Sequence, residues 1–184
     1  MRAPWLALAC LVAAACRSPE PPAAAKAGPE TGRYALPGTP ASIRPPDGWK
    51  KVPIETNGPL IAFESKPLAG ASSEPVLVLQ RIASGPVRPL EELAAVACGA
   101  GQPVEPPMTA KLGDRPVLQC AFDSKLAVRV NGGRPQTVPS RRRQYVIPDG
   151  GDVYVCAIGM DRAADSPAAR ALLDDFCGSL EFAP

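Results

Sequence analysis

The chain has 184 residues, 46% of them hydrophobic and 21% charged, which is enough apolar material to bury the core of one domain and hardly of two. Its formal net charge of +2 gives no general case for nucleic-acid binding, so no nucleic-acid partner is expected. The absence of histidine excludes Ser-His-Asp and Cys-His nucleophilic systems and every histidine-ligated zinc site. We also expect no cofactor and no metal.

The chain begins with the parts of an export signal. Arg2 makes the start positive, and residues 3–15 are a mainly apolar run that is shorter than the roughly 20 residues of a membrane span but typical of a signal peptide. Small residues before Cys16 resemble the lipobox of bacterial lipoproteins, in which the cysteine is acylated and becomes the new N-terminus, although Ala13 stands where leucine is usual. The resemblance implies that residues 1–15 are a lipoprotein signal peptide and that Cys16 is lipidated, with palmitate among its acyl chains. A soluble secreted protein cut near the same place is the alternative.

Residues 16–40 are rich in proline, alanine and glycine, a composition typical of an extended tether at roughly 3 Å per residue. Such a tether would hold the single domain expected at residues 41–184 away from the membrane that carries the lipid. Arg17, rather than aspartate, follows the cysteine and favours the outer membrane over the inner one, if the rule of enteric bacteria applies. We expect a bacterial cell-envelope protein with its domain in the periplasm or at the surface. Packing of residues 34–36 on the domain is the alternative for the end of the tether.

The cysteines predict two disulfides, because export removes Cys10 and the lipid occupies Cys16. The four that remain are Cys98, Cys120, Cys156 and Cys177. An even number in an oxidising compartment favours disulfides over a metal site, and no Cys-x-x-Cys motif occurs. We favour the pairs Cys98–Cys120 and Cys156–Cys177, each joining a helix end to a neighbouring strand. The alternative pairs are Cys98–Cys177 and Cys120–Cys156.

The first half of the domain predicts two strands and a helix. Short apolar runs at residues 60–64 and 75–82 have strand character. Residues 89–98 change to helical spacing, with proline in the first turn and Gly99 at the exit. The apolar face of this helix consists of Leu90, Leu93 and Ala97. The glycine-rich stretch that follows lacks the later glycine and the lysine of phosphate-binding loops, so we interpret it as the helix exit.

The second half predicts an antiparallel meander. Residues 116–130 are strand-like, Asn-Gly-Gly at 131–133 is a strong hairpin turn, and residues 141–147 form the next strand. A Pro-Asp-Gly-Gly turn at 148–151 then returns the chain through a strand at 152–159.

A second helix and a last short strand complete the pattern. Ser166 and Pro167 suit the cap and first position of this helix, and Gly178 suits its end. Its buried stripe is predicted to be Ala169, Leu172, Leu173 and Phe176. A strand at 179–182 follows. This order of elements indicates an α+β class with an antiparallel sheet and two helices.

The order and spacing of these elements resemble the PsbP-like superfamily, an α/β/α sandwich around an antiparallel sheet. The likeness rests on the opening at residues 43–49, the helix that begins near Leu90, the Gly-Asp strand start at 113–114 and the closing segment 177–182. It covers residues 41–183. Members of the superfamily mostly bind or scaffold, so the resemblance implies a non-catalytic role, and no functional residue is carried over by motif.

Three consecutive arginines form the sharpest charge cluster in the sequence. Because alternate residues of a strand face opposite sides, Arg141 and Arg143 are expected to share a face, beside Arg129 or Arg134 if the hairpin pairs as predicted. We favour a solvated strand that resists aggregation. The alternative is a patch formed by Arg129, Arg141 and Arg143 for an anionic partner such as lipid headgroups.

These observations lead to a functional hypothesis with two alternatives. We expect a lipid-anchored envelope lipoprotein that is not an enzyme and that binds or scaffolds an envelope protein or another envelope component. The first alternative is a small-ligand carrier with a cleft between sheet and helix. The second is a hydrolase built on carboxylates, which would need two acidic side chains converging in a cleft.

Overall fold

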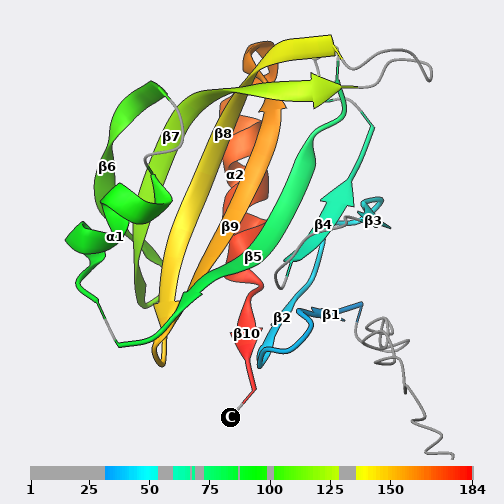
Figure 1. Cartoon of the computed structure of the whole chain (residues 1–184). Coiled ribbons are helices and arrows are strands. Elements are labelled where there is room, and N and C mark those ends of the chain that lie inside the picture. Colours follow the sequence, from blue (N-terminus) through cyan, green and yellow to red (C-terminus); the bar gives the residue numbers. More distant parts are fainter. Residues whose placement is uncertain are drawn as a thin grey trace, which may run out of the picture.

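The computed structural model describes residues 32–53, 60–66, 68, 73–86, 88–98, 102–128 and 136–183 (Figure 1). Within this part, seven strands form one antiparallel sheet in the order β3-β4-β5-β9-β8-β7-β6. They are β3 (Lys50–Val52), β4 (Leu60–Glu64), β5 (Val76–Ser84), β6 (Gln102–Leu112), β7 (Arg115–Val128), β8 (Gln136–Asp149) and β9 (Asp152–Asp161). The order places β9 at the centre of the sheet, between β5 and β8.

A tight hairpin at the predicted turn connects β8 to β9. Gly150 and Gly151 have φ angles of 56° and 99°, a region that favours glycine because a Cβ atom is strained there. The turn sets the register of the two strands, so that Asp149 lies opposite Asp152. The local Pro-Asp-Gly-Gly sequence therefore determines how β8 pairs with the central strand β9.

Two helices cover opposite faces of this sheet: α1 (Leu90–Ala97) and α2 (Pro167–Gly178). Figure 1 shows α1 in front of the strands and α2 behind them. The strand residues alternate accordingly. On β9, one set packs in the cluster below α1 and consists of Val153, Val155 and Ala157. The other set packs in the cluster below α2 and consists of Tyr154, Cys156 and Ile158. The predicted α+β class with two helices on an antiparallel sheet is confirmed, and its layers form an α/β/α sandwich.

Local signals explain where α2 begins and which side it buries. The Ser166 hydroxyl accepts a hydrogen bond from the Ala169 N–H at 3.3 Å, and Pro167 occupies the first turn. Of the predicted stripe, Ala169, Leu173 and Phe176 are buried, whereas Leu172 is only partly buried. No helix in the described ranges is long and apolar enough to cross a membrane.

A second, three-stranded sheet brings the two ends of the described chain together. Its order is β1 (Tyr34–Ala35), β2 (Ala41–Ile43) and β10 (Glu181–Phe182). Leu36, which follows β1, is 1% exposed and belongs to the core on the α2 side. The expectation that the tether extends to residue 40 is therefore corrected, because burial of this apolar side chain and pairing of β1 draw residues 34–36 into the fold.

Strand β6 was not predicted. It is an edge strand whose side chains are mostly exposed, so it lacks the alternation by which a half-buried strand is recognised. Pro103, Pro106 and Pro107 interrupt it, and its pairing with β7 shifts register on both sides of Glu105. Strand β8 also begins earlier than the predicted residue 141.

Candidate functional site

The disulfides attach each helix to the sheet face that it covers. Cys98, at the end of α1, is bonded to Cys120 of β7, with a Cα–Cα distance of 5.7 Å. Cys156 of β9 is bonded to Cys177 of α2, with a Cα–Cα distance of 5.8 Å. These are the two pairs that the sequence favoured, and all four cysteines are buried. The proposed lipidation site, Cys16, lies outside the described residues.

The arginine cluster contains a buried ion network. Arg143 donates from Nε to Oδ1 of Asp165 at 2.6 Å and from Nη2 to Oδ2 at 2.9 Å. The same Nη2 donates to Glu105 at 3.2 Å. Arg141 donates from Nη1 to Asp165 at 2.7 Å and from Nε to Asp123 at 2.8 Å. The two guanidinium groups thus bind three carboxylates from β6, β7 and the turn before α2.

This network differs from both sequence interpretations of the cluster. Arg141 and Arg143 do share a face, but that face is the one on which α2 lies, and Arg143 is 1% exposed. An external anion cannot reach Arg143 without displacing Asp165. Arg141 and Arg143 therefore do not form an exposed anion-binding patch. Arg129, the third member of the predicted patch, lies outside the described residues.

The charge state of Asp165 follows from its two arginines. Desolvation of its carboxylate, which is 5% exposed, acts to raise the pKa. The hydrogen bonds and positive charges of Arg143 and Arg141 outweigh that effect, and the pKa of Asp165 lies below its ordinary value. Asp165 is therefore ionised at neutral pH and holds the entry to α2 against β8. Nothing in the sequence near Asp165 indicates this role.

A groove between α1 and the sheet is the candidate binding site. A hollow of about 190 Å³ lies between α1 and the neighbouring ends of β5 and β9. Its walls are mainly apolar and include Ile82, Leu93, Val96 and Val153. A second hollow of about 230 Å³ adjoins it at the β8–β9 turn and shares lining residues with it, Arg88 and Gly151 among them. Each alone is smaller than the roughly 300 Å³ of a typical ligand pocket, but together they make a longer groove.

Backbone contacts hold the floor of the groove. The Gly85 N–H donates to the Gly151 carbonyl oxygen at 2.9 Å. A Cβ atom on Gly151 would lie 2.7 Å from the Gly85 oxygen, so the close approach of these two segments requires glycine. At the rim, Val96 is 61% exposed, an unusual position for an apolar side chain beside an apolar hollow.

A larger hollow of about 420 Å³ lies at the C-terminal end of α2. Both charged and apolar residues line it, including Asp114, Arg115 and Leu180. The guanidinium of Arg115 is already placed over the Phe182 ring, 4.6 Å from its centroid. This hollow lacks the continuous apolar wall that the groove beside α1 has, and we therefore take the groove as the candidate site.

Two acidic residues, Asp174 on α2 and Asp152 in the groove, are each bound to other side chains of the sheet. Asp174 is exposed on α2 and accepts a hydrogen bond from the Tyr145 hydroxyl. Desolvation and this bond raise the pKa of Tyr145. In the groove, Asp152 lies 3.5 Å from Arg81 and accepts a bond from the Tyr154 hydroxyl at 3.1 Å. Asp174 thus binds a tyrosine of the sheet, and Asp152 binds a tyrosine and an arginine of the sheet.

Comparison with known proteins finds solved structures but no family and no curated relative. No family model and no curated protein matches the chain. A structure from Bacteroides thetaiotaomicron matches with a TM-score of 0.51 and 9% identity, covering 78% of this chain. The chain spans only 45% of the length of that protein. At this identity the match shows a shared fold alone.

Two further solved structures are similar at lower TM-scores. LpqN of Mycobacterium tuberculosis, a protein involved in cell envelope biogenesis, has a TM-score of 0.46 and 18% identity, covering 78% of this chain and 83% of LpqN. Cyanobacterial PsbP from Synechocystis sp. PCC 6803 has a TM-score of 0.48 and 11% identity, covering 82% of this chain and 91% of that protein. The second is a protein of the superfamily that the sequence resembles, but neither similarity carries an argument about function.

Proposed function

We propose that the chain is a lipid-anchored protein of the bacterial cell envelope whose domain binds or scaffolds a partner and catalyses no reaction. The observation that carries the proposal is the disulfide pattern. The cysteines of the folded domain form two disulfides, Cys98–Cys120 and Cys156–Cys177, and such bonds persist outside the reducing cytosol. Together with the export signal, they support a location in the envelope, with the outer membrane favoured over the inner one.

The N-terminal end of the described domain lies on the opposite side of the main sheet from the groove. The described chain enters at β1, whose small sheet packs on the α2 side of the main sheet through Leu36, Ala41 and Ile43. The groove lies on the other side, between α1 and the sheet. A lipid on Cys16 would thus attach the domain from one side and leave the groove for an envelope protein or another envelope component.

The anchor is tested by labelling the full chain in bacterial cells with radioactive palmitate. Wild type and the control variant Cys10→Ser are expected to incorporate label and to fractionate with membranes, whereas Cys16→Ser is expected to do neither. Mass spectrometry of the mature protein should find its N-terminus at residue 16. A water-soluble product with an intact Met1 and four free thiols would refute the proposal.

A second candidate function, a carrier of small apolar ligands, is favoured by the apolar groove and the exposed Val96. Binding of an uncharged fluorescent alkyl probe to the full chain tests it. Val96→Asp should weaken binding because it puts a charge at the groove wall. Val104→Asp is the matched control, since Val104 is 37% exposed on the edge strand β6 and does not line the groove. Equal effects of the two variants would exclude the groove as the carrier site.

A further inference from the structure

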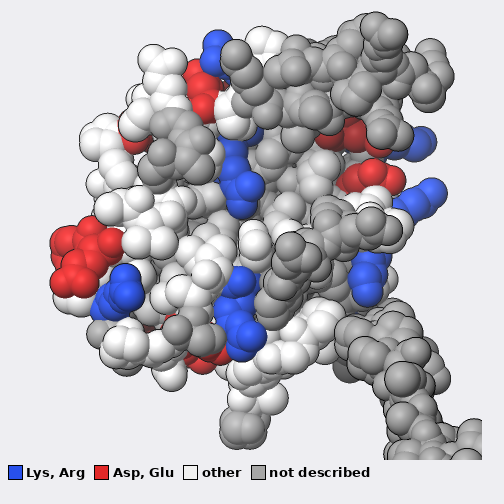
Figure 2. Space-filling model, in the orientation of Figure 1, with Lys and Arg blue, Asp and Glu red and all other residues white. Residues whose placement is uncertain are grey.

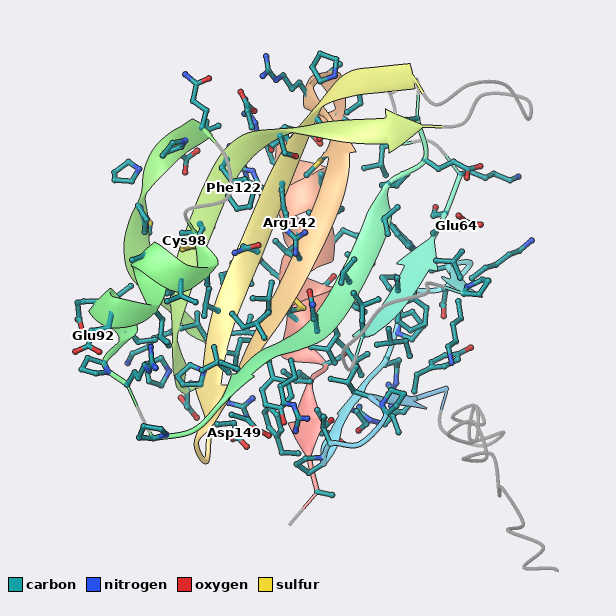
Figure 3. The ribbon with its side chains drawn as sticks, in the orientation of Figure 1. Glu64, Glu92, Cys98, Phe122, Arg142 and Asp149 are labelled. Atoms are coloured by element: carbon teal, nitrogen blue, oxygen red, sulfur yellow. A yellow bond between two sulfur atoms is a disulfide. The ribbon has the colours of Figure 1, made fainter. Side chains whose placement is uncertain are left out.

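Arg142 differs from both of its neighbours in the arginine cluster. Strand alternation places it on the α1 side of the sheet, opposite to Arg141 and Arg143. Among the described residues, no carboxylate lies within ion-pair distance of it, although each neighbour binds two. In Figure 3, Arg142 projects from the middle of β8, while the labelled acids Glu64, Glu92 and Asp149 lie away from it, towards the edges of the view.

A chain of hydrogen bonds holds the Arg142 guanidinium in one orientation. Gln144 is 2% exposed, and its Nε2 donates to the Ala97 carbonyl oxygen of α1 at 2.7 Å. This bond determines which way the amide faces, so that Oε1 accepts from Nε of Arg142 at 2.9 Å. The Nε side of the guanidinium is thus occupied. In the described structure no hydrogen bond uses the two terminal nitrogens, Nη1 and Nη2.

The residues paired directly with Arg142 on the neighbouring strands are apolar, while Ser124, Ser140 and Asp161 lie two residues further along the same face. It lies opposite Phe122 of β7 and Gly159 of β9, and Gly159 in turn lies opposite Val76 of β5. Gly159 presents no side chain, and a Cβ atom there would meet nothing closer than the Val76 carbonyl oxygen at 4.0 Å. The space-filling view of this face shows acidic groups gathered near its margins (Figure 2). Burial in this setting lowers the pKa of Arg142.

We propose that Arg142 and the apolar surface around it form a binding site for a monocarboxylate with an apolar tail. The two terminal N–H groups of a guanidinium match the two oxygens of one carboxylate. A single positive charge, with no second cation among the neighbours named above, suits a monoanion better than a phosphate dianion. The side-chain-free surface at Gly159 and the adjacent Val76 provide the contact for the tail.

This site is separate from the groove and does not depend on the lipid anchor. Gly159 is six residues along β9 from Val153, which lines the groove, a separation of roughly 20 Å in a strand. A ligand at Arg142 and an apolar ligand in the groove are therefore distinguished by different variants. Failure of one proposal leaves the other standing.

Titration of the full-length chain with butyrate, followed by NMR, tests the site. The readouts are the Nε–H signal of Arg142 and the backbone N–H signal of Gly159, which should shift together with one dissociation constant. Arg142→Gln should weaken the affinity read at Gly159 by about ten- to a hundredfold, the effect of losing a hydrogen-bonded charge. Arg142→Lys keeps the charge but not the paired donors and should also weaken binding. Arg44→Gln, at an exposed arginine, should leave it unchanged.

The other outcomes overturn the proposal. Absence of butyrate binding to the wild type, or equal affinity in Arg142→Gln, shows that the guanidinium is not a binding group. Equal binding of butanol shows that the carboxylate is not recognised, and equal binding of inorganic phosphate removes the preference for a monocarboxylate. A higher urea midpoint in Arg142→Gln supports the proposal, because a partly buried arginine without a counter-charge lowers the stability of the fold and is retained for binding. A large fall in the midpoint identifies Arg142 as a structural group instead.

Discussion

Replacing Asp165 by asparagine should destabilise the domain by about 3 kcal/mol. The change removes the charge that faces the bidentate pair of bonds from Arg143 and the bond from Arg141. Breaking a buried ion pair from one side costs roughly 3–5 kcal/mol, because a buried charge is left without compensation. Glu105 and Asp123 remain beside the two arginines and reduce the loss to the lower end of this range.

Urea unfolding at neutral pH with the disulfides intact measures this effect. Asp175→Asn is the matched control, because it removes the same charge from an exposed position on α2, and it should change the free energy of unfolding by less than about 0.5 kcal/mol. The slope of the unfolding free energy against urea should stay the same in both variants. Equal stabilities of Asp165→Asn and Asp175→Asn would refute the view that Asp165 holds α2 to the sheet.

The same pair of variants predicts a pH dependence. Because the pKa of Asp165 is lower in the folded state than its ordinary value of 3.8, ionised Asp165 stabilises the fold at pH values above 3.8. That contribution is lost as the pH falls below 3.8 and through the lower folded-state pKa. The difference in unfolding free energy between wild type and Asp165→Asn should therefore be constant near neutral pH and shrink in strong acid. A difference that grows on acidification would contradict the assignment.

Two further predictions concern the disulfides and the groove floor. Replacing either disulfide by serines should lower the free energy of unfolding by roughly 3 kcal/mol, because the two bonds close loops of similar length, with sequence separations of 22 and 21. Calorimetry of the two double variants measures this effect, and an unchanged stability in either variant would contradict the prediction. Gly151→Ala should destabilise the domain by about 1–3 kcal/mol, because Gly151 has a positive φ angle and a Cβ atom there would clash with the Gly85 carbonyl oxygen. Gly178→Ala is the control and should not destabilise it, because nothing lies within 4 Å of a Cβ atom at that position. Equal denaturation midpoints of the two variants would refute the packing argument.

Local sequence signals were sufficient for the helices and the central hairpin. Helical spacing predicted a helix over residues 89–98 with proline in its first turn, and the structure has Leu90–Ala97 with Pro89 as the N-cap residue. Ser166 and Pro167 marked the start of α2, and the Pro-Asp-Gly-Gly turn marked the β8–β9 hairpin. In each case the relevant interactions lie within a few residues of one another, so the pattern appears in a short stretch of sequence.

Segments without a local pattern could not be assigned in this way. Strand β6 is recognised only by its pairing with β7, because its exposed residues and prolines give no alternation. The role of residues 34–36 depends on the core that receives Leu36. The groove is likewise formed by α1 and by the ends of β5 and β9, which are distant in the chain.

The sequence by itself determined the α+β order of elements, the two helices, and the alternation that puts Arg141 and Arg143 on one face and Arg142 on the other. Only the tertiary structure decided which of these arginines has a counter-charge. Asp165 is 22 residues from Arg143 along the chain, and it reaches the guanidinium because α2 packs on that face. No corresponding element brings a carboxylate to Arg142 among the residues that the structure describes. The difference arises because periodicity orients a side chain, whereas its partners depend on the packing of distant elements.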